Sequence, residues 1–334
     1  MPTIFNIEGY SFDFTEPLTE LGEGSRVLLE APQGFVQYLP RLAAFLEEHG
    51  LRVYMRLDPA FGGCDIGCGY ASRLGVDAVI HIGHERYPLL PGSEECRVYY
   101  VPGEYVAGLD RVSEFASALL STGCRRVALA YSAQHRLLAG RLAEALRDMG
   151  FVVEAVRPIL GCYHYGLDSL RVDAVVVVAG GLFHALGLAL RLGEPGRVLP
   201  LDPYSAEPLQ VGRLRECYRS VLARRLWLVS RAMEGRRFAV IDGRKPGQHR
   251  PWLIEGILRA AGNAGFEVDV YISDTLSRDY LLNLRPGSYD AFIVASCPRI
   301  PIEDYTGSTS PIVLTPGEFM MAAAGRLEGY VFPW

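Results

Sequence analysis

One pattern recurs three times along the chain and limits the folds that it can adopt. A short apolar stretch, a loop and an amphipathic helix pattern follow one another, beginning at Arg26, Arg126 and Arg237. Each helix pattern ends close to a glycine, a common stop signal, and a second β-branched stretch follows it. The three glycines are Gly50, Gly150 and Gly265. Such an internal repeat predicts the same supersecondary unit three times.

An Asp-Ala step introduces a further strand in each repeat. The stretches are "VDAVIHIGH" with Asp77, "VDAVVVVAGG" with Asp173 and "YDAFIVASCP" with Asp290. Their apolar residues run continuously rather than alternating, which is typical of parallel strands that helices cover on both faces. The sequence therefore predicts an α/β fold of three similar domains, each a small parallel sheet flanked by helices. We place these domains at residues 1–108, 109–212 and 213–334.

The composition narrows the class of protein. The 334 residues carry a net charge of −5 spread along the chain, which argues against a nucleic-acid partner. We find neither a leader-like start nor an apolar run of the roughly 18 residues that cross a bilayer, so we expect a cytoplasmic protein without membrane contact. Seven cysteines are an odd number in a chain of this size, which favours reduced thiols, some of them bound to metal, over a disulfide scaffold.

The loops after the predicted strands are the expected place for a ligand, because ligands of open parallel sheets bind beyond the carboxyl ends of the strands. These loops span 32–34, 83–85, 132–135, 180–184, 243–248 and 296–299. We hypothesise that the three domains are arranged around one central site where these edges converge.

Three cysteines occupy loops at this edge, one in each predicted domain. Cys64 and Cys162 precede the Asp-Ala step of their repeats by similar spacings, and Cys297 ends the third repeat's strand. Three thiolates would leave one iron of a [4Fe–4S] cluster open to a substrate, because cysteine normally supplies four ligands. Zinc could also take three thiolates and a water molecule, so the spacing alone leaves the metal open.

The other cysteines lack this pattern. Cys68 completes a C-x3-C pair with Cys64, the first half of the C-x3-C-x2-C motif of usual radical S-adenosylmethionine enzymes, but Ala71 stands at the third position. We therefore interpret Cys68 as a bystander. Three cysteines without mates in the other repeats are expected to be small buried residues. They are Cys96, Cys124 and Cys217.

Three histidines lie at or beside the predicted strand ends. His81 and His84 in "HIGH" are close together, and a structural hydrogen-bonding role is expected for His81. His84 and His184 come from corresponding loops of two repeats and are candidates for the site.

Several stretches together resemble the archaeal 2-(3-amino-3-carboxypropyl)histidine synthases of diphthamide biosynthesis. They are "DPAFGGCD", "DAVIHIGHE", "VVVVAGGLFHALGLAL", "DGRKPGQHR" and "SCPRIPIEDYTGSTSPIVLTPGEF". The resemblance extends from about Val27 to Met320, with the motifs in the same order. The Cys-Pro-Arg segment followed by Leu-Thr-Pro-x-Glu is its most specific part.

The resemblance implies three α/β domains, a homodimer, and one [4Fe–4S] cluster per subunit held by Cys64, Cys162 and Cys297. It implies transfer of the 3-amino-3-carboxypropyl group of S-adenosylmethionine to a histidine of translation elongation factor 2. The implied chemistry is radical. An electron donor reduces the cluster, reductive cleavage breaks the bond from sulfur to the methionine γ-carbon, and methylthioadenosine is released. Two features depart from the family: "ERYP" follows "HIGH" where many relatives carry a Ser-Cys pair, and Cys68 is outside the ligand set.

One lysine, Lys245, stands among 33 basic residues. Together with Gln248 it lies in a loop after a predicted strand, and we hypothesise that Lys245 neutralises a carboxylate of the cofactor while Gln248 donates a hydrogen bond nearby. Arg299, close to Cys297, is the second candidate for that charge.

Two rival readings remain open at this point. A quinolinate-synthase-like enzyme would also use three cysteines and an open iron, which acts there as a Lewis acid. A cluster-bearing partner subunit without activity of its own would share the fold and the cysteines.

Overall fold

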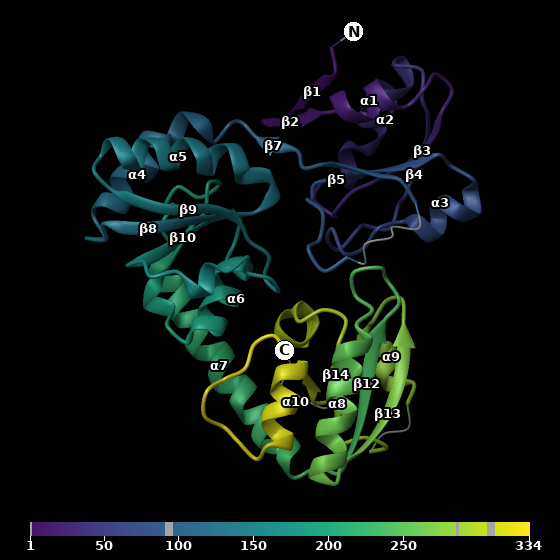
Figure 1. Ribbon diagram of the computed structural model, residues 1–334, viewed down its shortest axis with the longest axis vertical. Helices are drawn as coiled ribbons and strands as arrows, with labels where there is room; N and C mark the ends of the chain where they lie inside the picture. Colours follow the sequence, from purple (N-terminus) through teal and green to yellow (C-terminus); the bar gives the residue numbers. More distant parts are fainter. Residues whose placement is uncertain (1, 91–95, 285–286, 306–310) are drawn as a thin grey trace. The chain divides into compact units, whose positions relative to one another are not determined.

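A computed structural model describes residues 2–90, 96–284, 287–305 and 311–334 of the protein, and Figure 1 labels many of its helices and strands. The chain divides into two units. The first comprises Met1–Ala116, Tyr131–Ala145 and Lys245–Gly247. The second comprises Ser117–Ala130, Leu146–Arg244 and Gln248–Trp334. Among the described residues, every helix is too short or too polar to cross a membrane.

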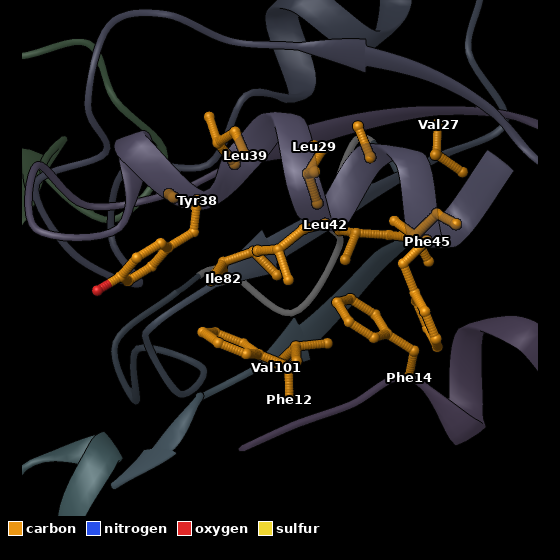
Figure 2. Close-up of a cluster of buried hydrophobic side chains, with 14 of the residues drawn as sticks. Phe12, Phe14, Val27, Leu29, Tyr38, Leu39, Leu42, Phe45, Ile82 and Val101 are labelled. Carbon is orange, nitrogen blue, oxygen red and sulfur yellow. The ribbon is translucent and has the colours of Figure 1, made fainter. Parts of the chain in front are cut away.

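The first repeat builds a parallel sheet in the first unit. Its strands are β3 (Arg26–Glu30), β4 (Arg52–Met55), β5 (Ala78–Ile82) and β6 (Val98–Val101). They lie in the order β4-β3-β5-β6, and each neighbouring pair is parallel. Helix α2 (Leu39–Glu48) places Leu42 and Leu46, four residues apart and so on one face, in the same buried cluster as Val27 and Leu29 of β3 (Figure 2).

A smaller antiparallel sheet completes this unit. Its strands are β1 (Ile4–Ile7), β2 (Tyr10–Asp13) and β7 (Glu104–Tyr105), in the order β1-β2-β7. Phe12 and Phe14 are fully buried in the cluster that α2 and β3 share, so this sheet closes the core (Figure 2). The remaining helices wholly inside this unit are α1 (Thr15–Glu20) and α3 (Cys68–Leu74).

The second and third repeats build the two sheets of the second unit. One contains β8 (Arg126–Tyr131), β9 (Val152–Pro158), β10 (Ala174–Val178) and β11 (Val198–Leu201). The other contains β12 (Arg237–Gly243), β13 (Glu267–Ser273), β14 (Ala291–Val294) and β15 (Val313–Leu314). Their orders are β11-β10-β8-β9 and β13-β12-β14-β15.

Helices connect the strands of these two sheets. The α-helices are α4 (Val112–Leu120), α5 (Arg136–Asp148), α6 (Phe183–Leu192), α7 (Val211–Met233), α8 (Pro251–Ala264), α9 (Arg278–Leu282) and α10 (Pro316–Ala323). The 3-10 turns of the chain are Val36–Tyr38, Leu109–Arg111, Ala133–His135, Leu167–Ser169 and Pro195–Arg197, and Ile300–Asp304 is a π-helical turn.

All three large sheets share one strand order. In each, the first strand of the repeat lies between the second and the third, and the fourth lies beyond the third. The predicted α/β class, with several parallel sheets flanked by helices, is confirmed. Each sheet falls inside one of the three predicted domains, and the division into three domains stays a prediction.

The Asp-Ala step has the same physical role in all three sheets. The aspartate carboxylate accepts a hydrogen bond from the backbone N–H of the arginine that begins the first strand, and the aspartate N–H donates to that arginine's carbonyl at 2.8 Å. The carboxylate bonds join Asp77 with Arg26 at 2.7 Å, Asp173 with Arg126 at 2.8 Å and Asp290 with Arg237 at 2.9 Å. This paired contact fixes where the first and third strands begin relative to each other.

Helix α7 contributes a fully buried guanidinium to the second unit. Arg225 forms a two-pronged ion pair with Glu318 of α10, at 2.7 Å for Nε–Oε1 and 2.5 Å for Nη2–Oε2. Its remaining N–H groups donate to the carbonyls of Pro301 and Val313. The pair therefore ties the segment that follows Cys297 to two helices.

We expect Glu318→Gln to lower the free energy of unfolding of the second unit by about 3–5 kcal/mol, because Arg225 would keep a buried charge without its partner. The chain's three tryptophans lie in this unit, so their fluorescence during guanidinium denaturation reports its unfolding. Glu234→Gln is the matched control, since its ion pair with Arg231 is exposed and is expected to be worth at most about 1 kcal/mol. Equal losses in the two variants would contradict this account.

Candidate functional site

Cys64 lies in a loop that two other loops of the first unit contact closely. Gly247 donates its backbone N–H to the carbonyl oxygen of Cys64 at 2.9 Å, and a Cβ at Gly247 would lie 2.6 Å from the Cys64 Cβ. A Cβ at Gly63 would lie 2.1 Å from the carbonyl oxygen of Glu85. Glycine is therefore required at both positions for the loops to approach Cys64 as they do.

A buried network of charges lies beside this loop. The Arg56 guanidinium contacts Glu30 at 3.0 Å and Asp65 at 3.4 Å, and Lys245 Nζ lies 2.5 Å from the second oxygen of Asp65. The lysine also lies over the ring of Phe61, 4.2 Å from its centre. Burial lowers the pKa of Arg56, but the carboxylates of Asp65 and Glu30 outweigh it and raise that pKa above its ordinary value.

Two histidines extend this network from the end of β5. His81 is fully buried, and its Nδ1 lies 2.7 Å from Oε1 of Glu30, which also accepts the backbone N–H of Gly67 at 3.1 Å. The other ring nitrogen of His81 lies 2.9 Å from Nδ1 of His84. The hydrogen-bonding role predicted for His81 is confirmed. The series of contacts from Glu30 through His81 to His84 was not predicted from the sequence.

In the second unit, Phe183 at the start of α6 contacts the segments that carry the other two cysteines. A Cβ at Gly161, next to Cys162, would lie 2.1 Å from the Phe183 ring. The guanidinium carbon of Arg299, two residues after Cys297, lies 5.6 Å from the centre of the same ring. The second unit therefore brings the Cys162 and Cys297 segments to one aromatic side chain.

The histidine next to this ring has a shifted pKa. Burial, with a smaller effect of the Arg299 charge, lowers the pKa of His184 to about 4, and its Nδ1 is buried without a hydrogen-bond partner among the described residues. Burial likewise lowers the pKa of His164 to about 4. Both imidazoles are therefore neutral near pH 7.

The Cys297 segment is held by a second buried arginine. Arg250 donates to the carbonyls of Ala295 at 2.8 Å and Ser296 at 2.6 Å. Burial raises the pKa of the Cys297 thiol. Gln248 is buried in the same unit, whereas Lys245 belongs to the first unit.

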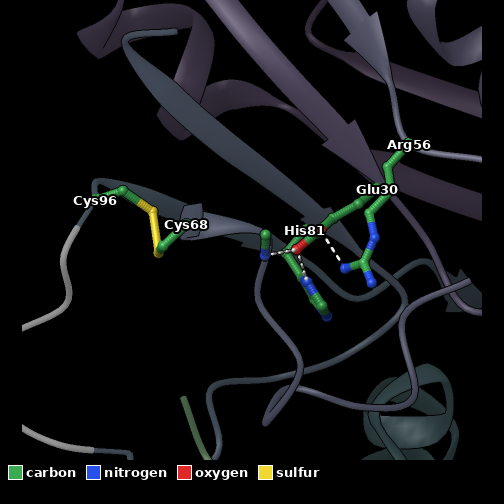
Figure 3. Close-up of a disulfide and its surroundings, with 6 residues drawn as sticks. Glu30, Arg56, Cys68, His81 and Cys96 are labelled. Atoms are coloured by element: carbon green, nitrogen blue, oxygen red, sulfur yellow. Dashed lines mark hydrogen bonds and ion pairs between the residues drawn. A yellow bond between two sulfur atoms is a disulfide. The ribbon is translucent and has the colours of Figure 1, made fainter. Parts of the chain in front are cut away.

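Two expectations about the remaining cysteines are wrong, namely that they are reduced thiols and that Cys96, Cys124 and Cys217 are buried. Cys68, the first residue of α3, forms a disulfide with Cys96, which precedes β6, with 5.4 Å between the Cα atoms (Figure 3). The sequence missed this bond because α3 packs on the sheet and brings residues 28 apart in sequence together. Cys124 lies in a loop and Cys217 lies on a partly exposed helix, so both are half-buried rather than buried.

The three predicted ligands, Cys64, Cys162 and Cys297, are thiols and not disulfides. The first lies in the first unit and the other two in the second. Within the described ranges, no group of three or more His, Cys, Asp or Glu side chains is arranged to hold a metal ion. Each of these thiols is half-buried, and cysteine thiolates are the usual ligands of iron–sulfur clusters, so the donor type fits such a group.

Several residues that shape these surroundings are not among the candidates that the sequence motifs indicate. They are Glu30, Arg56, Asp65, Phe183 and Arg250. A carboxylate that ends the apolar stretch "RVLLE" is the one local signal among them, because a charge at the end of a buried strand needs a partner.

The sequence and the fold of this chain are those of a known class. Residues 31–330 match the family model described as "Putative diphthamide synthesis protein". The chain belongs to this family of diphthamide synthesis proteins, as the sequence motifs predicted. Residues 306–310 of the most specific motif lie outside the described residues.

Individual relatives and a solved structure agree with the family. The chain is 29% identical to a 2-(3-amino-3-carboxypropyl)histidine synthase of Pyrococcus horikoshii, over 92% of this chain and 88% of the relative. It is 25% identical to subunit 1 of the human synthase, over 94% of this chain and 72% of the relative. A crystal structure of Dph2 from Pyrococcus horikoshii with a 4Fe-4S cluster matches with a TM-score of 0.80 and 27% identity, over 98% of this chain and 94% of that one.

We expect Gly63→Ala to displace the Cys64 loop and to destabilise it by about 1–3 kcal/mol, because the new methyl group would overlap the Glu85 carbonyl. Hydrogen exchange of peptides covering residues 60–90 and the rate of Cys64 alkylation measure the change, and both should rise. Gly69→Ala in α3, where a Cβ meets nothing within 4 Å, should leave both unchanged. Equal behaviour of the two variants would refute the packing argument.

Proposed function

We propose that this protein transfers the 3-amino-3-carboxypropyl group of S-adenosylmethionine to a histidine of translation elongation factor 2, the first step of diphthamide biosynthesis. The observation that carries the proposal is the family match over most of the chain, together with the retention of three thiols at Cys64, Cys162 and Cys297. Both archaeal relatives are 2-(3-amino-3-carboxypropyl)histidine synthases, a name that gives their product as a histidine substituted at position 2.

In this proposal Cys64, Cys162 and Cys297 hold a [4Fe–4S] cluster. When bound, the cluster supplies the electron that cleaves the carbon–sulfur bond of S-adenosylmethionine, and its fourth iron binds the cofactor. The three thiols must lose their protons to bind iron. The charges of Arg250 and Arg299 favour the anionic thiolate of Cys297, but burial outweighs them and raises its pKa.

Cofactor contacts are proposed from both units. Lys245 and Gln248 follow β12, Arg299 follows Cys297, and His84 and His184 follow the third strands of their sheets. Lys245 already pairs with Asp65, so its charge is shared with a protein carboxylate. We propose that Lys245 both holds the Cys64 loop and attracts the cofactor's carboxylate. Lys245 and Arg299 would then supply the positive charge that orients the amino-acid end of the cofactor.

The proposed partners are elongation factor 2 as substrate, an electron donor, and a second copy of the chain in a homodimer. The proposed location is the cytoplasm, where elongation factor 2 acts. A quinolinate-synthase-like reaction would need no S-adenosylmethionine, and a partner subunit would need another chain for activity.

The test is anaerobic incubation of the reconstituted chain alone with S-adenosylmethionine, dithionite and archaeal elongation factor 2. We expect methylthioadenosine by chromatography and a modified histidine peptide by mass spectrometry. Cys162→Ala should abolish both products, because the cluster loses a ligand, while Cys124→Ala should retain them. If iron-loaded wild-type protein releases no methylthioadenosine, the proposed reaction is wrong.

A further inference from the structure

We propose that His84 accepts the proton that leaves the substrate imidazole, and that His81 and Glu30 hold His84 in the tautomer needed for this. The inference rests on the proposed function and adds a role that the reaction requires. It concerns the described chain of contacts from Glu30 through His81 to His84.

The balance of the proposed reaction calls for a base. Cleavage of the carbon–sulfur bond takes up one electron and gives methylthioadenosine and a 3-amino-3-carboxypropyl radical, which forms a C–C bond to carbon 2 of the imidazole. The ring regains aromaticity when one electron returns to the oxidised iron–sulfur centre and the C–H bond at carbon 2 breaks, releasing its hydrogen as a proton. The net reaction consumes no electron and releases one proton, so a nearby group must accept it.

The hydrogen-bond chain defines which nitrogen of His84 is basic. Glu30 is fully buried and paired with Arg56, and its carboxylate can only accept, so Nδ1 of His81 carries the hydrogen (Figure 3). In the proposed arrangement His81 is neutral and its other nitrogen accepts, 2.9 Å from Nδ1 of His84. Nδ1 of His84 is therefore the donor, and its Nε2 is the basic nitrogen.

The same chain can stabilise the proton once it arrives. When Nε2 of His84 gains a proton, the proton on Nδ1 can pass to His81, whose imidazolium would lie 2.7 Å from the Glu30 carboxylate. A carboxylate behind a histidine orients the imidazole and stabilises its charged form in this way.

The position of His84 supports this role. His84 directly precedes Glu85, whose carbonyl closes on Gly63 beside Cys64. Gly67, in the same loop as Cys64, donates its N–H to the carboxylate that anchors the histidine chain. The proposed base and the proposed cluster ligand are therefore fixed by the same loop contacts.

The first experiment separates cofactor cleavage from transfer. With reconstituted enzyme, S-adenosylmethionine, dithionite and elongation factor 2, we expect His84→Gln to slow modification of elongation factor 2 on the order of 100-fold more than it slows methylthioadenosine formation, because loss of a cofactor contact slows both equally and loss of the base slows transfer alone. His49→Gln is the matched control, because His49 is also half-buried in the first unit but hydrogen-bonds to the carbonyls of Phe45 and Pro2. It should modify the factor at the wild-type rate.

The second experiment reads the tautomer without cluster or substrate. In cluster-free protein labelled with 15N-histidine, NMR should show hydrogen on Nδ1 of both His81 and His84 near neutral pH. Glu30→Gln should weaken this preference, since an amide can donate as well as accept.

Three outcomes would overturn the inference. They are wild-type modification by His84→Gln, equal loss of methylthioadenosine and modification in that variant, and hydrogen on Nε2 of His84 in the cluster-free protein. The absence of methylthioadenosine from wild-type enzyme would instead overturn the proposed function.

Discussion

Three aspartate carboxylates fix where the first and third strands of the three large sheets begin relative to each other. Each binds the backbone of the arginine that starts the neighbouring strand, so the first and third strands of every sheet are in a defined register. Because the first and third strands are parallel, the loops with the candidate functional side chains leave from the carboxyl edge of each sheet. Ligand sites of parallel sheets lie at that edge.

Buried charges fix the conformation of these loops. Arg56 and Glu30 anchor the Cys64 loop and the two histidines, and Arg225 and Arg250 hold the segments on either side of Cys297. A buried ion pair contributes little net stability, but the loss of one partner is costly. Such pairs therefore favour one arrangement of the loops, as the proposed transfer between several reactants would require.

The sequence predicted the sheets because their signals are local. Apolar runs of "DAVIHIGH" type, the recurring Asp-Ala step and the glycines after the helices each act within one repeat. The contacts of the site are not local: Lys245 pairs with a carboxylate 180 residues away, and Phe183 meets Arg299 from another sheet. The Cys68–Cys96 bond was missed because cysteine spacing does not determine connectivity. The cysteine trio stays a prediction: the repeat register relates Cys64 to Cys162, and Cys297 was added because it lies at the end of the third repeat's strand.

The most direct test of the account is whether Cys64, Cys162 and Cys297 together hold one cluster. Anaerobic reconstitution followed by iron and sulfide analysis should give about four of each per chain. The reduced protein should show the electron paramagnetic resonance signal of a [4Fe–4S] centre. Alanine at any one of the three cysteines should abolish or strongly diminish that signal, while Cys217→Ala should retain it. A reconstituted wild-type protein that binds zinc and no iron would contradict the central claim.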